Sequence, residues 1–356
     1  MKKMIAAVLA LILALGLCAC GAASAPAESA AAEKASTDAQ PAEETNADSF
    51  EADKEKGLAL FRDEDYEGAY EVLAQYADSG DAEVSGMIGY CYYGGWGVEQ
   101  DYEKAAEYLS IAADADISEA QYAMGILYEY GYGVEQDDVK AAEYEAKAAD
   151  AGYADAQLEL GYFYEYGYGV EQSYDKALEY YTLASEQGNT IAMTNIGIMY
   201  ECGNGVDKDP KRAVEYYQKA ADMGDARGQA YLAIMYRDGN GVQKDYAKAV
   251  EYYTLAAEQD NLTALNNLAI LYVEGKGVEK DVTKATELYT RAAELGEPYA
   301  QYNLGMAYFM GSGVEKSYEK SAYWFNECVN NPYSDDDILK DAAEKLENPN
   351  VKAALK

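Results

Sequence analysis

The stretch AQYAMGILYEYGYGVEQDDVKAAEYEAKAADAGYAD, residues 120–155, holds one copy of a pattern that recurs along this chain of 356 residues. Its centre, Gly131 to Val134, is a GxGV motif, and the motif returns every 36 residues. The seven glycine–valine pairs are Gly97-Val98, Gly133-Val134, Gly169-Val170, Gly205-Val206, Gly241-Val242, Gly277-Val278 and Gly313-Val314. A fixed interval without slippage is typical of a repeat array, so we expect recognition along an extended surface rather than chemistry in one cleft.

The first half of each repeat predicts an α-helix. In the quoted copy, Ala123, Leu127 and Tyr130 recur at helical spacing. A small residue stands mid-helix in every copy, which indicates that another helix crosses closely there. These small residues are Gly89, Gly125, Gly161, Gly197, Ala233, Ala269 and Gly305. Each is followed three residues later by a tyrosine: Tyr92, Tyr128, Tyr164, Tyr200, Tyr236, Tyr272 and Tyr308.

The second half of each repeat predicts another helix, and the GxGV motif marks the break between the two. Its glycines allow positive φ, and we expect its valine to pack inward. Side-chain oxygens then cap the second helix; the caps are Asp101, Asp137, Ser173, Asp209, Asp245, Asp281 and Ser317. A basic residue follows each cap three positions later: Lys104, Lys140, Lys176, Arg212, Lys248, Lys284 and Lys320. No β-strand signal appears, so the predicted fold class is all-α, an α-solenoid of stacked helix hairpins.

The copy from Ala192 to Gly224 resembles the Sel-one-like repeat, a relative of the tetratricopeptide repeat. The matching residues are Ala192, Ile196-Gly197, Tyr200, Gly203, Gly205-Val206, Asp209, Arg212-Ala213, Tyr216-Tyr217, Lys219-Ala220-Ala221 and Gly224. The resemblance covers residues 84–335 in seven copies. It implies a right-handed superhelix whose concave face holds other proteins, and it implies no enzyme activity.

The remaining segments complete a repeat solenoid that we place at residues 54–347. Residues 54–83 resemble a shorter unit without the GxGV insertion and are interpreted as an N-terminal cap. Residues 336–347 are interpreted as a C-terminal capping helix, and residues 348–356 as a tail.

The N-terminus is typical of a bacterial lipoprotein. Lys2 and Lys3 precede a short apolar run, and residues 1–19 are interpreted as the signal peptide. Cys20 has the neighbours that lipoprotein processing prefers, so it is the predicted lipidation site; the alternatives are an uncleaved anchor or ordinary secretion. Residues 20–53 have few large apolar residues and are interpreted as a lipidated cysteine with a disordered acidic tether. We therefore expect export and lipid anchoring at the outer face of the bacterial cell membrane or in the cell envelope.

Composition excludes several kinds of function. The chain carries 28 basic and 64 acidic residues, a net charge of −36. This charge disfavours nucleic acid and anionic lipid surfaces, and it serves either solubility or the attraction of basic partners. Histidine is absent, which removes the commonest general base and metal ligand. The GxGV motif lacks the preceding strand and third glycine of a dinucleotide site. We predict no enzyme activity, no cofactor and no metal, and the oligomeric state stays open.

Three cysteines lie in the repeats. Cys91 and Cys328 share columns with apolar residues and are expected in the core, whereas Cys202 is expected to be exposed. They belong to distant repeats, so we predict no internal disulfide.

The first helices are expected to line the binding groove, as in the related tetratricopeptide fold. The predicted groove residues are Tyr90, Tyr93, Tyr122, Glu129, Tyr130, Tyr162, Glu165, Tyr166, Glu201 and Arg237. Tyrosine offers large contact area and a hydroxyl at low entropic cost, although most of the 37 tyrosines fall in packing columns. The first hypothesis is a scaffold that binds a protein or peptide segment, with a basic one favoured by the charge. The alternative is a carbohydrate-binding lipoprotein whose groove tyrosines stack on sugars.

Overall fold

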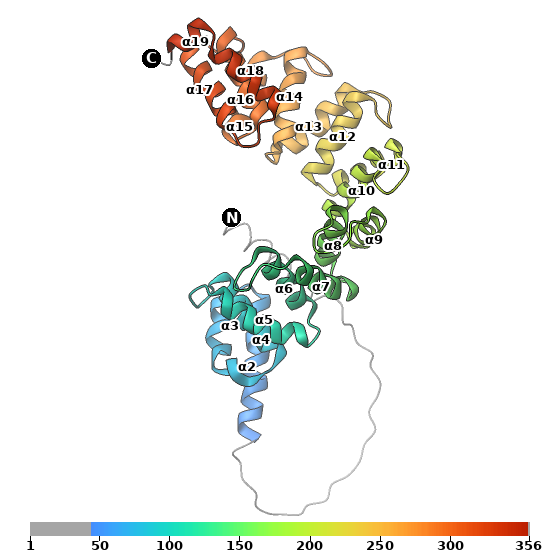
Figure 1. The fold of residues 1–356 in the computed structure, drawn as a ribbon, viewed down its shortest axis with the longest axis vertical. Coiled ribbons are helices and arrows are strands. Elements are labelled where there is room, and N and C mark those ends of the chain that lie inside the picture. Colours follow the sequence, from blue (N-terminus) through green and yellow to red (C-terminus); the bar gives the residue numbers. More distant parts are fainter. Residues whose placement is uncertain (1–43, 355–356) are drawn as a thin grey trace, which may run out of the picture. The chain divides into compact units, whose positions relative to one another are not determined.

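The computed structural model describes residues 44–354, in which every regular element is helical. The predicted signal peptide, Cys20 and the first part of the tether lie outside these residues. Seven hairpins of two helices follow one another along the chain (Figure 1). The fold class predicted from the sequence, an all-α solenoid, is therefore confirmed.

All fourteen helices of the seven hairpins are 13 residues long. The hairpins are α4 (Ala82–Gly94) with α5 (Tyr102–Asp114), α6 (Ser118–Tyr130) with α7 (Asp138–Asp150), α8 (Ala154–Tyr166) with α9 (Tyr174–Glu186), α10 (Thr190–Cys202) with α11 (Pro210–Asp222), α12 (Ala226–Asp238) with α13 (Tyr246–Glu258), α14 (Leu262–Glu274) with α15 (Val282–Glu294), and α16 (Pro298–Met310) with α17 (Tyr318–Asn330). Within each of the two units described below, successive hairpins pack on one another, as expected of a repeat too small to form a core alone.

The N-terminal cap begins earlier than its composition suggests. Helix α2 (Glu44–Arg62) packs on α3 (Tyr66–Leu73), which continues into the 3₁₀ turn η1 (Ala74–Ser79). Residues 44–53, assigned to the tether from their composition, are thus helical. The ring of Phe50 packs against the ring of Tyr76, with centroids 5.0 Å apart, and Asp53 accepts a 2.7 Å hydrogen bond from the Tyr76 hydroxyl. These contacts tie the segment to the solenoid, which composition alone does not reveal.

The C-terminal cap contains two helices instead of one. Helix α18 (Asp336–Leu346) closely matches the predicted capping helix. The segment interpreted as a tail adds α19 (Pro349–Ala354), whose Val351 is fully buried in a cluster with Phe325 and Cys328. The segment, NPNVKAALK, has few large apolar residues, and this signal is too weak to predict the contact.

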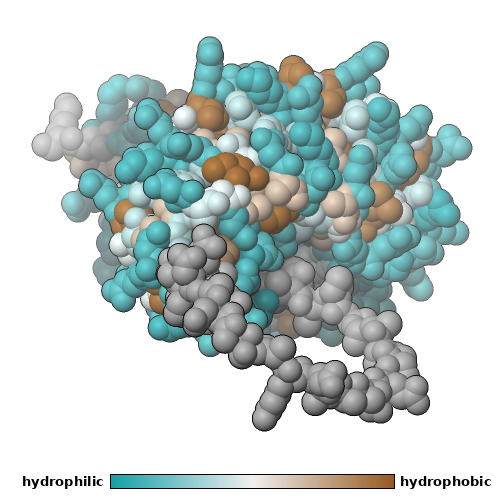
Figure 2. Space-filling model, turned by 90° about the horizontal axis from the view of Figure 1, so that it is seen from below, coloured by the Kyte–Doolittle hydropathy of each residue, from teal (hydrophilic) through white to brown (hydrophobic). Residues whose placement is uncertain are grey.

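The chain divides into two units, Met1–Gln187 and Gly188–Lys356, and each has its own packed interior. In the first unit, α2 to α9 enclose apolar side chains such as Leu109 and Phe163. In the second unit, α10 to α19 do the same around residues such as Leu268 and Phe325. On the face drawn in Figure 2, hydrophilic residues surround small apolar patches, as the acidic composition requires.

The GxGV turn works through two different glycines. Gly167 ends α8 at φ 77°, and its N–H donates a 2.8 Å hydrogen bond to the carbonyl of Phe163. Gly169, at φ 64°, passes so close to the start of α7 that a methyl group there would overlap the carbonyl oxygen of Asp138. The second glycine therefore permits contact between successive hairpins. Val170 packs on the interior but stays half-buried, so the inward valine is confirmed only in part.

The helix-crossing prediction is also confirmed. A side chain added at Gly161 of α8 would lie 2.6 Å from the ring of Tyr181 in α9. Each of the five mid-helix glycines faces a residue twenty positions later on the second helix of its hairpin. The predicted caps form as well, since Asp137 accepts from the backbone N–H of Lys140.

The cysteines lie where their columns place them. Cys91 and Cys328 are buried, and Cys202 is exposed. Burial raises the pKa of the Cys91 thiol to about 12, so this residue behaves as a core filler rather than as a nucleophile.

Candidate functional site

The tyrosine ladder of the first helices serves packing. Tyr128 of α6 stacks on Tyr144 of α7, with ring centroids 5.7 Å apart, and the ammonium of Lys140 lies 5.0 Å from the Tyr128 ring centre. The same arrangement recurs around Tyr164, where Lys176 lies 4.5 Å from the ring. In six of the seven repeats the basic residue that follows the cap makes this cation–π contact within its hairpin, whereas Lys284 pairs with Glu287. These tyrosines are half-buried and are not the binding surface.

The predicted groove tyrosines separate into a buried and an exposed group. Tyr90, Tyr93 and Tyr122 are 4%, 4% and 5% exposed and belong to the interior. Tyr130 is 57% exposed, Tyr166 52% and Tyr162 39%. Only this second group can offer its rings to a partner.

Two predicted groove carboxylates are held by tyrosines of the second helix. Glu165 accepts a 2.6 Å hydrogen bond from Tyr181, and Glu201 accepts a 2.8 Å bond from Tyr217. Burial and the facing carboxylate raise the pKa of both phenols. These glutamates stabilise their own hairpins, because each tyrosine hydroxyl donates a hydrogen bond to a carboxylate that would otherwise be buried without a partner.

Arg237 of α12 stands at the repeat position that Glu165 and Glu201 hold in their helices, and it is basic where they are acidic. Its guanidinium donates two 2.8 Å hydrogen bonds to Asp238 and one of 3.0 Å to Asn267. The ion pair lowers the pKa of Asp238. Arg237 is therefore engaged within its own unit.

Two hairpins have this glutamate–tyrosine arrangement, and in the hairpin α6–α7 a second glutamate stands where they have the tyrosine. The crossing residues of the second helices are Leu109, Glu145, Tyr181, Tyr217, Tyr253, Tyr289 and Phe325. Glu145 is fully buried against Gly125 of α6, and neither carboxylate oxygen has a hydrogen-bond partner among the described residues. The signal that could have revealed it was present in the sequence, because it is the one acidic residue in an otherwise apolar and aromatic column.

Glu145 belongs to a cluster of carboxyls contributed by three successive helices. Glu129 of α6 and Glu159 of α8 are both half-buried and act on it electrostatically, as does Asp155. Burial, reinforced by these charges, holds the pKa of Glu145 well above its usual range. Burial and the neighbours Glu129 and Asp155 raise the pKa of Glu159 to about 7. Glu129 is shifted upward too, mainly by burial.

No basic group offsets this cluster in the part of the chain that the structure describes. The groups that act on Glu129, Glu145 and Glu159 are carboxyls and one tyrosine hydroxyl, that of Tyr130. The lysines of α7 point elsewhere, since Lys140 covers Tyr128 and Lys147 covers Tyr144. The site is thus a buried carboxyl cluster that lacks counter-charge.

Exposed tyrosines surround the cluster. Tyr130 follows Glu129 in α6 and stacks on Tyr132, with ring centroids 5.6 Å apart. On α8, Tyr162 packs on Tyr166 at 4.5 Å and on Tyr168 at 5.8 Å. Glu129 and Glu159 act electrostatically on both Tyr130 and Tyr162, so the two groups of rings border the same carboxyls.

Tyr132 and Tyr168 were missed from the sequence. They occupy the variable position of GxGV, which is aromatic in the first three repeats and polar in the last four: Trp96, Tyr132, Tyr168, Asn204, Asn240, Lys276 and Ser312. We define the tyrosine–carboxylate site as Glu129, Glu145, Glu159, Tyr130, Tyr132, Tyr162, Tyr166 and Tyr168. It lies wholly within the first unit.

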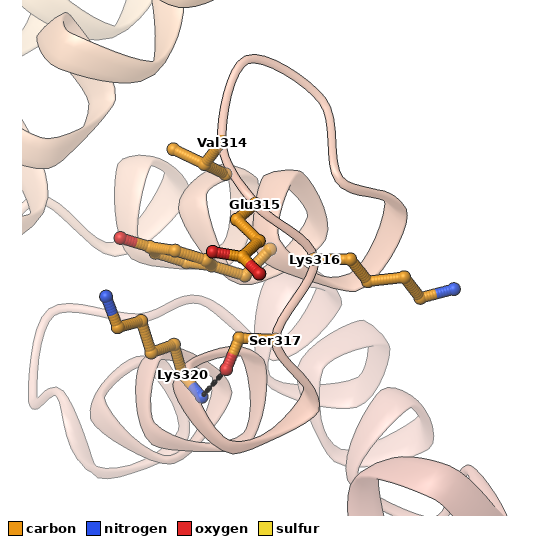
Figure 3. A pocket seen from close by; sticks show the side chains of 6 residues that line it. Val314, Glu315, Lys316, Ser317 and Lys320 are labelled. Carbon is orange, nitrogen blue, oxygen red and sulfur yellow. Dashed lines mark hydrogen bonds between the residues drawn. The ribbon is translucent and has the colours of Figure 1, made fainter.

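A cavity of about 400 Å³ in the last repeat has a different origin (Figure 3). It is lined by Tyr308, Val314, Glu315, Lys316, Ser317 and Lys320. The Oγ of Ser317 accepts the backbone N–H of Lys320 at 3.2 Å, and the Lys320 ammonium lies 5.1 Å from the Tyr308 ring centre. Because these are the cap and cation–π contacts of the repeat itself, the cavity shows no feature specific to a ligand.

The arrangement of side chains in the described residues suits binding. No group of three or more histidine, cysteine, aspartate or glutamate side chains between residues 44 and 354 is arranged to hold a metal ion. Within the same range, no helix has the length and apolar character needed to cross a membrane. A carboxyl cluster bordered by aromatic rings favours a cationic ligand.

These features define a helical-repeat solenoid with a tyrosine–carboxylate site on its first helices. The Sel1 repeat model matches residues 86–117, 118–153, 154–189, 190–225, 226–261, 262–297 and 298–327, and the chain belongs to the Sel1 repeat family. Proteins built on this repeat generally act as protein-interaction scaffolds and are typically not enzymes.

Two solved structures show the same fold. A Sel1 repeat protein from Oxalobacter formigenes is 34% identical, with 67% of this chain and 96% of that chain covered and a TM-score of 0.64. The protective antigen c5321 of uropathogenic Escherichia coli, which displays an SLR fold, is 28% identical, with 86% and 74% covered and a TM-score of 0.55. A search of curated proteins gives no match.

Proposed function

We propose that this protein is an envelope-tethered scaffold that holds an extended protein segment against the tyrosine–carboxylate site of its first unit. The observation that carries the proposal is the exposure of Tyr130, Tyr162, Tyr166 and Tyr168 around carboxyls without counter-charge. The second unit also exposes tyrosines, among them Tyr323 and Tyr333, and these serve as the comparison.

The chemistry of this surface favours a basic partner. The chain has a net charge of −36, which attracts cationic segments over long distances and speeds their association. Rigid rings provide apolar contact area, and their faces attract cations. We place the scaffold at the outer face of the membrane, held by a lipid on Cys20; replacing Cys20 by serine is expected to release the protein from the membrane fraction.

The test is affinity capture from solubilised cell envelope with the chain as bait. The double variant Tyr130→Ala/Tyr166→Ala removes two exposed rings of the site. The matched control Tyr323→Ala/Tyr333→Ala removes two exposed rings of the second unit. We expect a protein that is retained by the wild type and by the control but lost with the site variant.

Equal retention by both variants would overturn the proposed site. A salt-sensitive interaction is expected, because opposite charges attract the partner. Binding of purified cell-wall glycan fragments that persists at high salt, with no captured protein, would contradict the scaffold and favour sugar binding.

A further inference from the structure

Glu145 is costly for folding and has an available replacement. A buried polar group without a hydrogen bond destabilises a protein, because it loses its bonds to water and gains none in return. Two other hairpins place a tyrosine at the same position, where its hydroxyl bonds to the facing glutamate: Tyr181 to Glu165, and Tyr217 to Glu201. Glu129 is the corresponding facing residue for Glu145, so a tyrosine here would find its partner ready. The chain thus keeps an unfavourable residue at a position where other repeats carry a tyrosine that forms a hydrogen bond. Such a departure from the repeat pattern indicates a functional position.

We propose that Glu129, Glu145 and Glu159 form the pocket that receives a lysine or arginine side chain of the partner segment, an assignment that rests on the proposed scaffold function. Each carboxyl comes from a different helix, so the pocket spans α6, α7 and α8. Tyr130 and Tyr162 border it and act on the same carboxyls.

The occupant follows from charge complementarity. The carboxyls have no basic neighbour among residues 44–354, and a cationic side chain supplies the missing charge. We expect its head group to pair with the half-buried Glu129 and Glu159, while the fully buried Glu145 adds its charge and the methylene stem packs along the tyrosine rings. An anionic or neutral side chain gains nothing at this position, so the pocket selects the residue type that the partner presents.

The raised pKa values predict that binding of a cation is linked to the protonation of these carboxyls. Burial and mutual repulsion favour the protonated carboxyls in the free protein. A bound ammonium or guanidinium favours the ionised forms, so occupation of the pocket releases protons. The groups facing Glu145 are Glu129 and Tyr122 from α6, and Tyr153, Asp155 and Glu159 from the α8 side.

The test uses fluorescein-labelled deca-lysine and deca-arginine as probes of the full chain, measured by anisotropy in about 150 mM salt, where long-range attraction is screened. The key variant is Glu145→Gln, which keeps the shape and removes the carboxylate. Its matched control is Glu143→Gln, an exposed residue of the same helix with the same loss of charge. We expect Glu145→Gln to weaken binding at least about tenfold and Glu143→Gln to change it less than about twofold.

The outcomes separate the pocket from the scaffold. If both glutamine variants weaken binding equally, the attraction is general and the pocket is wrong. If Tyr130→Ala/Tyr166→Ala abolishes peptide binding while Glu145→Gln leaves it intact, the scaffold surface stands and the pocket assignment fails. If the wild type binds neither peptide, the proposed basic-partner function itself fails.

A second variant guards against loss of fold. Glu145→Tyr follows the pattern of the other hairpins and is expected to fold at least as stably as the wild type. It removes the same carboxyl, so it too is expected to weaken deca-lysine binding at least about tenfold. Unchanged binding by a well-folded Glu145→Tyr protein would overturn the pocket.

Discussion

At the scale of the residue, Glu145 shows how a repeat protein marks a functional position. Six other hairpins place an apolar or aromatic residue at its position, and Glu145 alone buries a carboxyl there without a hydrogen bond. The replacement Glu145→Tyr is expected to raise the free energy of unfolding by about 1–3 kcal/mol near pH 7, because the hydroxyl can bond to Glu129. Chemical denaturation followed by circular dichroism measures the change.

The stabilisation by Glu145→Tyr is expected to depend on pH. The pKa of Glu145 is raised by folding, so the native state keeps its proton while the unfolded chain ionises. Stability from this group is therefore greatest below the unfolded pKa of about 4.3 and falls as pH rises toward the folded pKa. Glu145→Tyr has no carboxyl at this position and does not lose this stability, so its free energy of unfolding exceeds that of the wild type by more at pH 7 than at pH 4. The reverse exchange Tyr181→Glu, which buries a carboxyl against Glu165, serves as the control and is expected to destabilise; an equal advantage at both pH values would contradict the account.

At the scale of the element, the sequence predicts the hairpins well because each boundary has a local cause. Caps such as Asp137 and turn glycines such as Gly167 act within a few residues, so their positions fix where helices begin and end. The predicted end of the tether is wrong because Phe50 of α2 packs against Tyr76 of η1, a residue 26 positions later in the chain. Local patterns do not contain such contacts.

The candidate site could be predicted only in part, since tyrosine occurs in both packing and surface columns. Tyr130 and Tyr166 were identified as surface residues, whereas Tyr90, on the same list, is buried. Helical spacing gives the direction of a side chain but not how deeply the next hairpin covers it. Glu145 required a comparison of its column across all seven hairpins.

The contact between successive hairpins gives a prediction at this scale. Gly169→Ala places a methyl group against the backbone of Asp138 at the start of α7, and it also strains a positive φ. The control Gly152→Ala carries the same type of strain at φ 92°, with no atom within 4 Å of the added methyl. We expect Gly152→Ala to cost about 1 kcal/mol of stability and Gly169→Ala at least about 2 kcal/mol more, measured by urea denaturation. Equal costs would show that the second glycine of GxGV serves only the turn.

At the scale of the whole molecule, acidic residues have two roles that net charge does not distinguish. Most of those in the described residues are at least partly exposed and favour solubility, and hydrophilic residues cover much of the face in Figure 2. A few, such as Glu165 and Glu201, are bonded to tyrosines within their own hairpins. The cluster around Glu145 belongs to neither group, because it is largely buried and the Glu145 carboxyl has no hydrogen-bond partner. In our proposal it is the place where a basic segment, attracted by the overall negative charge, binds.

This division predicts how partner binding responds to pH and salt. Glu159 titrates at about pH 7 in the free protein because burial and the neighbouring Glu129 and Asp155 favour its protonated form. A lysine stays charged up to about pH 10, so only the pocket changes, and the affinity for deca-lysine is expected to rise several-fold from pH 6 to pH 8.

Added salt acts on the whole surface and is expected to lower the affinity at every pH, whereas the rise with pH belongs to the pocket. In the variant Glu159→Gln the affinity should be lower and its dependence on pH flatter, while the salt dependence remains. Anisotropy titrations of wild type and variant across both conditions test this expectation. An affinity that does not change between pH 6 and pH 8, or that responds identically in the variant, would mean that the peptide is held by diffuse charge and that the carboxyls of α6, α7 and α8 do not bind its side chain.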